Sequence, residues 1–153
     1  MVLSRKLLVA STLALTLTAF GQEKKIDRSA LPAAVEKTVQ AQSEGAVIKG
    51  FTTEREHGTR VYEAEMMVSG HSKDIEIASD GTLNEIEEGV VFDSLPASVR
   101  AALTKKAAGA KITRVESLTK HGKLVAYEAG ILKGTRHGEI QVGPEGQTMA
   151  HEE

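Results

Sequence analysis

Apolar side chains recur at helical spacing in two segments of the chain, one before Gly45 and one before Gly109. In each segment the apolar positions fall on a single helix face. They are Leu31, Ala34, Val35 and Val39 in the first segment, and Leu95, Val99, Ala102 and Leu103 in the second. The pattern predicts two helices of about three turns, each burying one side against a core.

Local signals mark where these helices begin and end. Pro32 and Pro96 suit a first helical turn, where the missing N–H costs little. Gly45 and Gly109 stand where a helix needs a residue that tolerates positive φ to end it. Polar residues that could cap the helix starts come before each proline, Ser29 in the first segment and Asp93 or Ser94 in the second.

After each glycine the pattern changes to strand-like segments joined by turn residues. In the first half these segments are 47–54, 61–68, 74–78 and 82–87, and in the second half they are 112–119, 124–132, 139–142 and 147–151. Because the loops between them are short, the strands should pair in an antiparallel manner. Apolar and charged side chains alternate within them, as in Tyr62-Glu63-Ala64-Glu65-Met66, so one sheet face should be apolar and the other charged.

The two halves are copies of one pattern. Leu31-Pro32-Ala33 returns as Leu95-Pro96-Ala97 at a spacing of 64 residues, and after one inserted residue Tyr62-Glu63-Ala64 returns as Tyr127-Glu128-Ala129. Because the matches keep their order and fall on core and turn positions, they repeat a folding unit. The prediction is an α+β fold of two tandem repeats, residues 22–88 and 89–153. Each repeat has one helix followed by three or four antiparallel strands, with the helices packed on one face of the antiparallel sheet.

The first 21 residues have the features of a secretory signal peptide. Arg5 and Lys6 precede an apolar run over residues 7–19, and Ala19-Phe20-Gly21 places small residues where a signal peptidase needs them. A membrane anchor is the alternative, but polar residues interrupt the run, which falls short of the about 20 apolar residues that span a bilayer. We therefore expect cleavage near Gly21 and a periplasmic or secreted protein with no membrane span in the mature chain.

Charge and cysteine content narrow the function classes. Loss of Arg5 and Lys6 would take the formal net charge from -2 to -4. A net negative charge does not favour binding to nucleic acid or to an anionic membrane surface, because both attract clustered Lys and Arg. The sequence contains no cysteine, so an exported form would have no disulfide and its core must hold the fold.

The order of these features resembles a tandem pair of PepSY-type repeats. The resemblance is carried by Leu-Pro at each helix start, Gly-Ala-x-Ile at each helix end, His-Gly turns, Tyr-Glu-Ala in a strand and a closing Asp80-Gly81, and it extends from about Ala30 to Met149. More narrowly, the chain is similar to small secreted PepSY-like proteins grouped by fold with beta-lactamase inhibitor protein. This implies an exported, non-catalytic protein that binds or restrains peptidases or other envelope proteins. Glu145 and Gly130 depart from typical members, so the halves are not expected to be equivalent in function.

Acidic residues on the polar side of the strands form the main candidate binding site. As a docking surface they would prefer a basic partner, with an association that weakens as salt rises. As a solvated sheet face they would need no function. The candidate residues are Glu63, Glu65, Asp74, Glu76, Glu128 and Glu139.

Five histidines raise the alternative of a periplasmic carrier of a small ligand or metal. His57 and His121 occupy matching turns, and His71 and His137 lie in nearly matching loops. Their spacing is not that of converging zinc ligands, and no nucleophile context for catalysis is present, so we expect no cofactor, no metal and no enzyme activity. The leading hypothesis is an exported binding module, an inhibitor of a peptidase or a regulator of another envelope or secreted protein.

Overall fold

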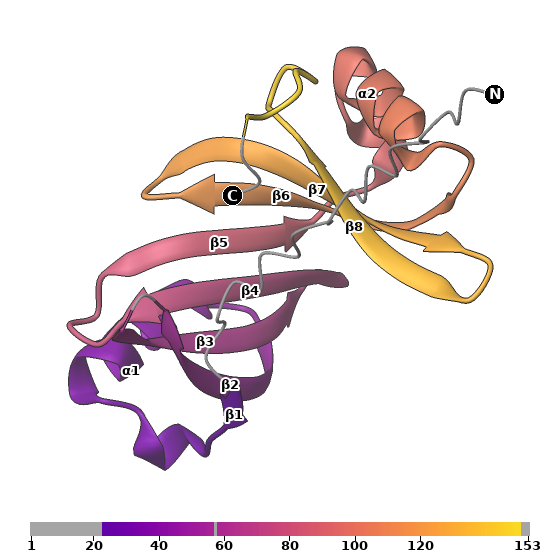
Figure 1. Cartoon of the computed structure of the whole chain (residues 1–153). Helices are drawn as coiled ribbons and strands as arrows, with labels where there is room; N and C mark the ends of the chain where they lie inside the picture. Colours follow the sequence, from indigo (N-terminus) through magenta and orange to yellow (C-terminus); the bar gives the residue numbers. More distant parts are fainter. Residues whose placement is uncertain (1–22, 57, 151–153) are drawn as a thin grey trace, which may run out of the picture.

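The computed structural model describes residues 23–56 and 58–150. Within them, eight strands form one antiparallel sheet in which every strand pairs with its neighbours in chain order, from β1 to β8 (Figure 1). Two α-helices accompany the sheet, one near each end of the strand order. The predicted α+β class and the antiparallel pairing are confirmed.

The strands and helices follow the predicted order, with longer strands than the sequence indicated. They are β1 (Lys24–Lys25), α1 (Ala33–Gln42), β2 (Val47–Glu56), β3 (Thr59–Val68), β4 (His71–Ala78), β5 (Leu83–Gly89), α2 (Ala97–Ala107), β6 (Lys111–Lys120), β7 (Lys123–Lys133) and β8 (Arg136–Val142). The short strand β1 was not predicted. The strand expected over residues 147–151 was wrong for its described part, residues 147–150, which form no strand.

The predicted helix caps are also wrong. Neither helix has a side-chain hydrogen bond at its N-cap, which is Pro32 for α1 and Pro96 for α2. Ser29, Asp93 and Ser94 lie instead in short 3-10 turns that precede the helices. A proline forces the residue before it into extended backbone, which separates each turn from its helix. The positive φ predicted at Gly45 and Gly109 is confirmed, at 71° and 82°, although the helix C-caps are Ser43 and Ala108, just before these glycines.

The core consists of two clusters, one under each helix. Val35 and Val39 of α1 are fully buried against Met66 and other apolar residues of β2 to β5. Val99 and Leu103 of α2 are fully buried in a second cluster formed with β6 to β8. One row of paired residues crosses β3 to β8 from the first cluster to the second, so both helices cover the same sheet face. The row is Met66, Lys73, Glu88, Ser117, Tyr127 and Val142.

A tight turn fastens the sheet to each helix. At Gly81 a Cβ atom would lie 2.7 Å from the carbonyl oxygen of Ala34, and Thr38 Oγ1 donates a hydrogen bond to Gly81 O at 2.6 Å. At Gly146 a Cβ would lie 2.6 Å from the carbonyl oxygen of Ser98. Only glycine fits such close approaches, and both positions also have positive φ. The helices are thereby held against one face, which leaves the opposite face of the sheet without a helix.

Candidate protein-binding face

The sheet face opposite the helices carries a set of acidic side chains that we call the open face. All six carboxylates predicted from the sequence lie on it. The structure adds Glu85 and Glu87 of β5 and Glu116 of β6, together with Arg114 and Lys120 of β6. The carboxylates of the open face are Glu63, Glu65, Asp74, Glu76, Glu85, Glu87, Glu116, Glu128 and Glu139.

Strand register arranges these carboxylates in rows across the sheet. Glu63, Glu76 and Glu85 stand opposite one another on β3, β4 and β5, followed by Lys120 on β6. The next row is Glu65, Asp74 and Glu87 on the same three strands. A third row runs from Glu116 through Glu128 to Gln141 on β6 to β8. Like charges on opposite residues of paired strands repel one another, so this pattern costs the fold stability.

The structure brings together residues that the sequence patterns missed. Glu85 and Glu87 alternate with Ile86, and this alternation was a usable signal that β5 would add carboxylates to the charged face. For Glu116 the comparable signal was its place next to Val115 in a segment already predicted as a strand. The position of Arg114 among the acids depends on pairing between distant strands, which no local pattern reveals.

Burial and mutual repulsion raise the pKa of several open-face carboxyls. Burial is the larger cause for Glu63, whose pKa rises to about 7, while Asp74, Glu23 and Glu65 add repulsion. The pKa of Asp74 rises to about 6, first through burial and then through Glu116 and Glu65. Burial raises the pKa of Glu87 to about 8, with repulsion from Glu85, Glu116 and Glu128. Part of this face is therefore protonated at neutral pH.

Positive charge is distributed unevenly over the open face. Arg114 lies 2.9 Å from Glu116, 2.6 Å from Glu139 and 3.6 Å from Glu128, measured between guanidinium nitrogens and carboxylate oxygens. Lys120 lies 3.4 Å from Glu85. The ion pairs that join described residues do not include Glu63, Glu65 or Asp74. The part of the face on β6 to β8 is thus partly neutralised from within the chain.

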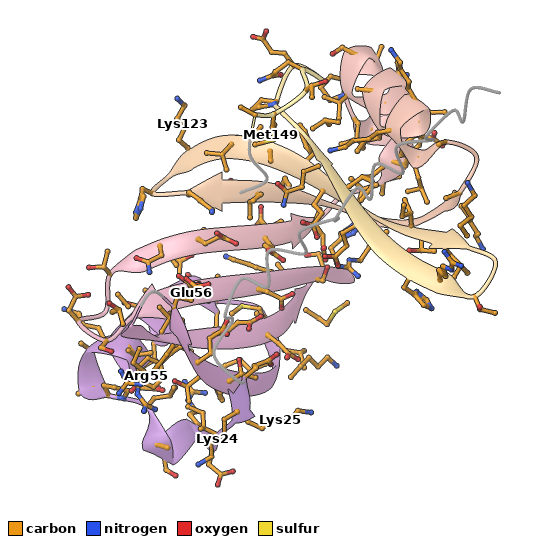
Figure 2. All side chains as sticks on the ribbon, in the orientation of Figure 1. Lys24, Lys25, Arg55, Glu56, Lys123 and Met149 are labelled. Carbon is orange, nitrogen blue, oxygen red and sulfur yellow. The ribbon has the colours of Figure 1, made fainter. Side chains whose placement is uncertain are left out.

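Uncharged donors serve some of the remaining carboxylates. Thr52 Oγ1 donates to Glu63 at 3.1 Å, and the amide of Asn84 donates to Glu76 at 2.9 Å. Thr52, Glu63 and Glu76 help to line a hollow of ≈ 180 Å³ between β2 and β5, whose wall is mainly acidic. In Figure 2 the labelled lysines Lys24, Lys25 and Lys123 lie at the margins of the sheet, away from its middle strands.

Three carboxylates of the open face approach closely enough to share a cation. Oxygens of Asp74, Glu87 and Glu116 lie within 4.8 Å of one another, and this is the one such group of possible metal ligands among the described residues. They could contribute to the shell of a hard cation such as Ca²⁺, which takes six to eight oxygens. No histidine belongs to the group. His57 and His151 lie outside the described residues, so the predicted equivalence of the His57 and His121 turns is not tested.

The open face belongs to a fold that several solved structures share. A protein from Bacteroides eggerthii that is thought to be periplasmic matches with a TM-score of 0.63 and 15% identity, over 76% of this chain and 84% of its own. A BLIP-like protein from Bacteroides fragilis matches with a TM-score of 0.58 and 17% identity, over 80% of this chain and 85% of its own. A DUF2874 family protein from Bacteroides ovatus gives a TM-score of 0.59 and 17% identity, over 76% and 82% of the two chains.

This chain has a BLIP-like fold. At such low identity the likeness concerns the fold alone. No family model matches the sequence, and no curated protein is similar to it in sequence. Neither α1 nor α2 has the length and apolar character of a membrane-spanning helix, and these are the α-helices of the described residues.

Proposed function

We propose that this protein is an exported, non-catalytic binding module that uses the open face to bind another protein of the cell envelope or the medium. The observation that carries the proposal is a broad acidic face that no helix covers, on a sheet whose other face packs against α1 and α2. The fold it shares with BLIP-like and periplasmic proteins supports an exported location. A peptidase is one partner class that fits, with this protein as its inhibitor or regulator.

The partner should present basic side chains. Carboxylates of Glu63, Glu65 and Asp74 have no cation of this chain within ion-pair distance among the described residues. A basic partner would relieve the repulsion across the rows and gain Coulomb energy in a partly desolvated setting. Such an association should form quickly at low salt and weaken as salt rises.

The proposal also covers the removal of an N-terminal signal peptide and the origin of the chain as two repeats. We infer that residues 1–21 are a signal peptide and that residues 22–88 and 89–153 are two PepSY-like repeats. Support for the repeats comes from the matching order of one helix and antiparallel strands in each half, with one core cluster under each helix. Mass spectrometry of the protein exported by its host checks the processing, because cleavage near Gly21 fixes the mass of the mature chain.

A capture experiment with a charge-reversed open face tests the binding function. The variant carries Glu63→Lys, Glu65→Lys and Glu128→Lys. Its matched control carries Glu44→Lys, Glu88→Lys and Glu145→Lys, which make the same charge change at exposed positions off the open face. Circular dichroism establishes that both variants fold.

Envelope extract from the host supplies the partner. We expect the wild type and the control to retain the same protein, with retention falling as salt rises, and the open-face variant to lose it. Equal retention by the two variants would refute the use of this face. Absence of any retained protein would count against a binding module altogether.

A further inference from the structure

Two bulges occupy corresponding places in the sheet. The pairing of β2 with β3 shifts register between Ile48 and Gly50, and the pairing of β6 with β7 shifts between Ile112 and Arg114. These positions are 64 residues apart, the spacing of the sequence duplication. Gly50 stands opposite Glu65, whereas Arg114 stands opposite Gly130. One half thus has an arginine facing a glycine where the other has a glycine facing a glutamate.

The arginine on β6 shows what a cation does at this position. Arg114 Nε donates to Glu116 at 2.9 Å and Arg114 Nη2 donates to Glu139 at 2.6 Å, so one guanidinium serves carboxylates on two strands. Its stem crosses Gly130, where a Cβ would lie 3.1 Å from Arg114 Cγ. The glycine therefore makes room for the arginine to lie along the sheet.

The corresponding place on β2 has acids around it and no counterpart of Arg114. Asp74 stands beside Glu65 in the row that Gly50 begins, and neither carboxylate has an ion-pair partner among the described residues. A Cβ on Gly50 would meet a single neighbour, Glu65 Oε2 at 3.9 Å. A hollow of ≈ 350 Å³ opens there, lined by Gly50, Thr52 and Glu65 and also by Asp27, Lys25 and Lys49.

We propose that an arginine side chain of the partner protein fills the space above Gly50 and binds Glu65 and its neighbours Glu63 and Asp74, as Arg114 binds its three carboxylates. The inference rests on the proposed function, since it names the residue type through which the partner docks. Arginine fits better than lysine because its planar fork donates to several carboxylates at once. Repulsion from neighbouring carboxylates adds to burial in raising the pKa of Glu63 and of Asp74, and a cation placed here would offset that repulsion.

A peptide titration of the mature protein tests this site. The probe is acetyl-Gly-Ser-Arg-Ser-Gly-amide, and its control has citrulline, the uncharged analogue, in place of arginine. Carbon-13 NMR of side-chain carboxyls reports binding at millimolar peptide. We expect the resonances of Glu63, Glu65 and Asp74 to move with the arginine peptide and to stay unmoved with the citrulline peptide. Resonances that do not move with the arginine peptide would overturn the inference.

The variant Gly50→Arg supplies the missing cation from within the chain. Gly50 is absent from the positive-φ glycines and its Cβ position is open, so arginine can be accommodated. We expect it to weaken peptide binding by roughly tenfold or more, because charge-assisted hydrogen bonds to the peptide are lost. Gly50→Ala is the matched control and should bind like the wild type. Glu65→Gln, which preserves shape, should also weaken binding and serves if Gly50→Arg does not fold.

Retention of the envelope partner by the Gly50 variants distinguishes the proposed binding function from the proposed arginine site. If wild type, Gly50→Ala and Gly50→Arg all retain the partner equally while the charge-reversed open face loses it, the binding function stands and the arginine site is wrong. If Gly50→Arg alone among the three loses the partner, both stand. Peptide affinity that is the same in Gly50→Arg and Gly50→Ala also overturns the site.

Discussion

Replacing Glu87 by glutamine should stabilise the fold near pH 8 and change little near pH 4. Glu87 lies half-buried on β5, in the middle of the open face. Asp74 of β4 is its neighbour on one side, and strand β6 lies on the other. Burial, followed by repulsion from Glu85, Glu116 and Glu128, raises its pKa to about 8. Glutamine keeps the shape of the side chain and removes the charge. The variant therefore isolates the cost of ionising this one carboxyl in the folded protein.

The direction of the pH dependence follows from proton linkage. A carboxyl whose pKa is higher in the folded than in the unfolded state binds more protons when folded, so stability falls as pH rises between the two values. For Glu87 the window runs from its ordinary 4.5 to about 8. Below this window the Glu87 carboxyl is protonated in the folded and in the unfolded state, so it has no charge that lowers stability. Above it the cost is complete, so the advantage of glutamine is greatest there.

The shift in the pKa of Glu87 sets an upper limit on the stabilisation expected from Glu87→Gln. A change from 4.5 to about 8 corresponds to at most about 5 kcal/mol, at about 1.4 kcal/mol for each pKa unit. Solvent reaches part of the side chain and the neighbouring acids share the repulsion, so screening reduces this limit. We expect Glu87→Gln to add about 1 to 2 kcal/mol to the free energy of unfolding near pH 8.

Urea unfolding at several pH values measures the difference. The control is Glu88→Gln on the same strand, because Glu88 is exposed and points to the other face. It should change stability by less than about 0.5 kcal/mol at every pH. If Glu87→Gln and Glu88→Gln gave the same pH profile, or if the gain of Glu87→Gln were greatest near pH 4, the account of the open face as a strained acidic surface would be refuted.

Three further variants test the fold and the internal cation. Gly81→Ala should cost more than Gly70→Ala in thermal unfolding, by about 1 to 3 kcal/mol. Both glycines have positive φ, but only at Gly81 does a Cβ meet backbone, 2.7 Å away. Leu103→Ala, at a fully buried side chain of α2, should cost about 2 to 5 kcal/mol in urea unfolding. Arg114→Gln should raise the pKa of Glu128 further in carboxyl NMR, because Arg114 now lowers it.

The alternation of apolar and charged residues predicted much of this architecture. In β3 it placed Tyr62, Ala64 and Met66 toward the core and Glu63 and Glu65 away from it, as the structure shows. The same period put six carboxylates on one side of the strands before any pairing was known. Side-chain direction along a strand is a local property with a period of two, so it can be inferred from sequence alone.

Other features depend on contacts between distant segments. The caps were misplaced because the prolines before Ala33 and Ala97, rather than polar side chains, fix where the helices begin. Residues 147–150 have strand character but fold back, with Gly143 N donating to Gln147 O at 2.9 Å. The β1 strand of two residues carries too short a pattern to detect. Propensity is a weak prior that such tertiary contacts override.

The difference between the halves follows from one exchange across paired strands. A sheet with the same charges in both halves would have a cation at both bulges or at neither. Here Arg114 opposite Gly130 neutralises acids on β6 to β8, whereas Gly50 opposite Glu65 leaves the acids on β3 and β4 exposed to each other. Repulsion of this kind lowers stability unless another group relieves it. The acids of β3 and β4 lack an internal cation like Arg114, which neutralises the acids of β6 to β8. We therefore propose that a partner protein supplies this cation.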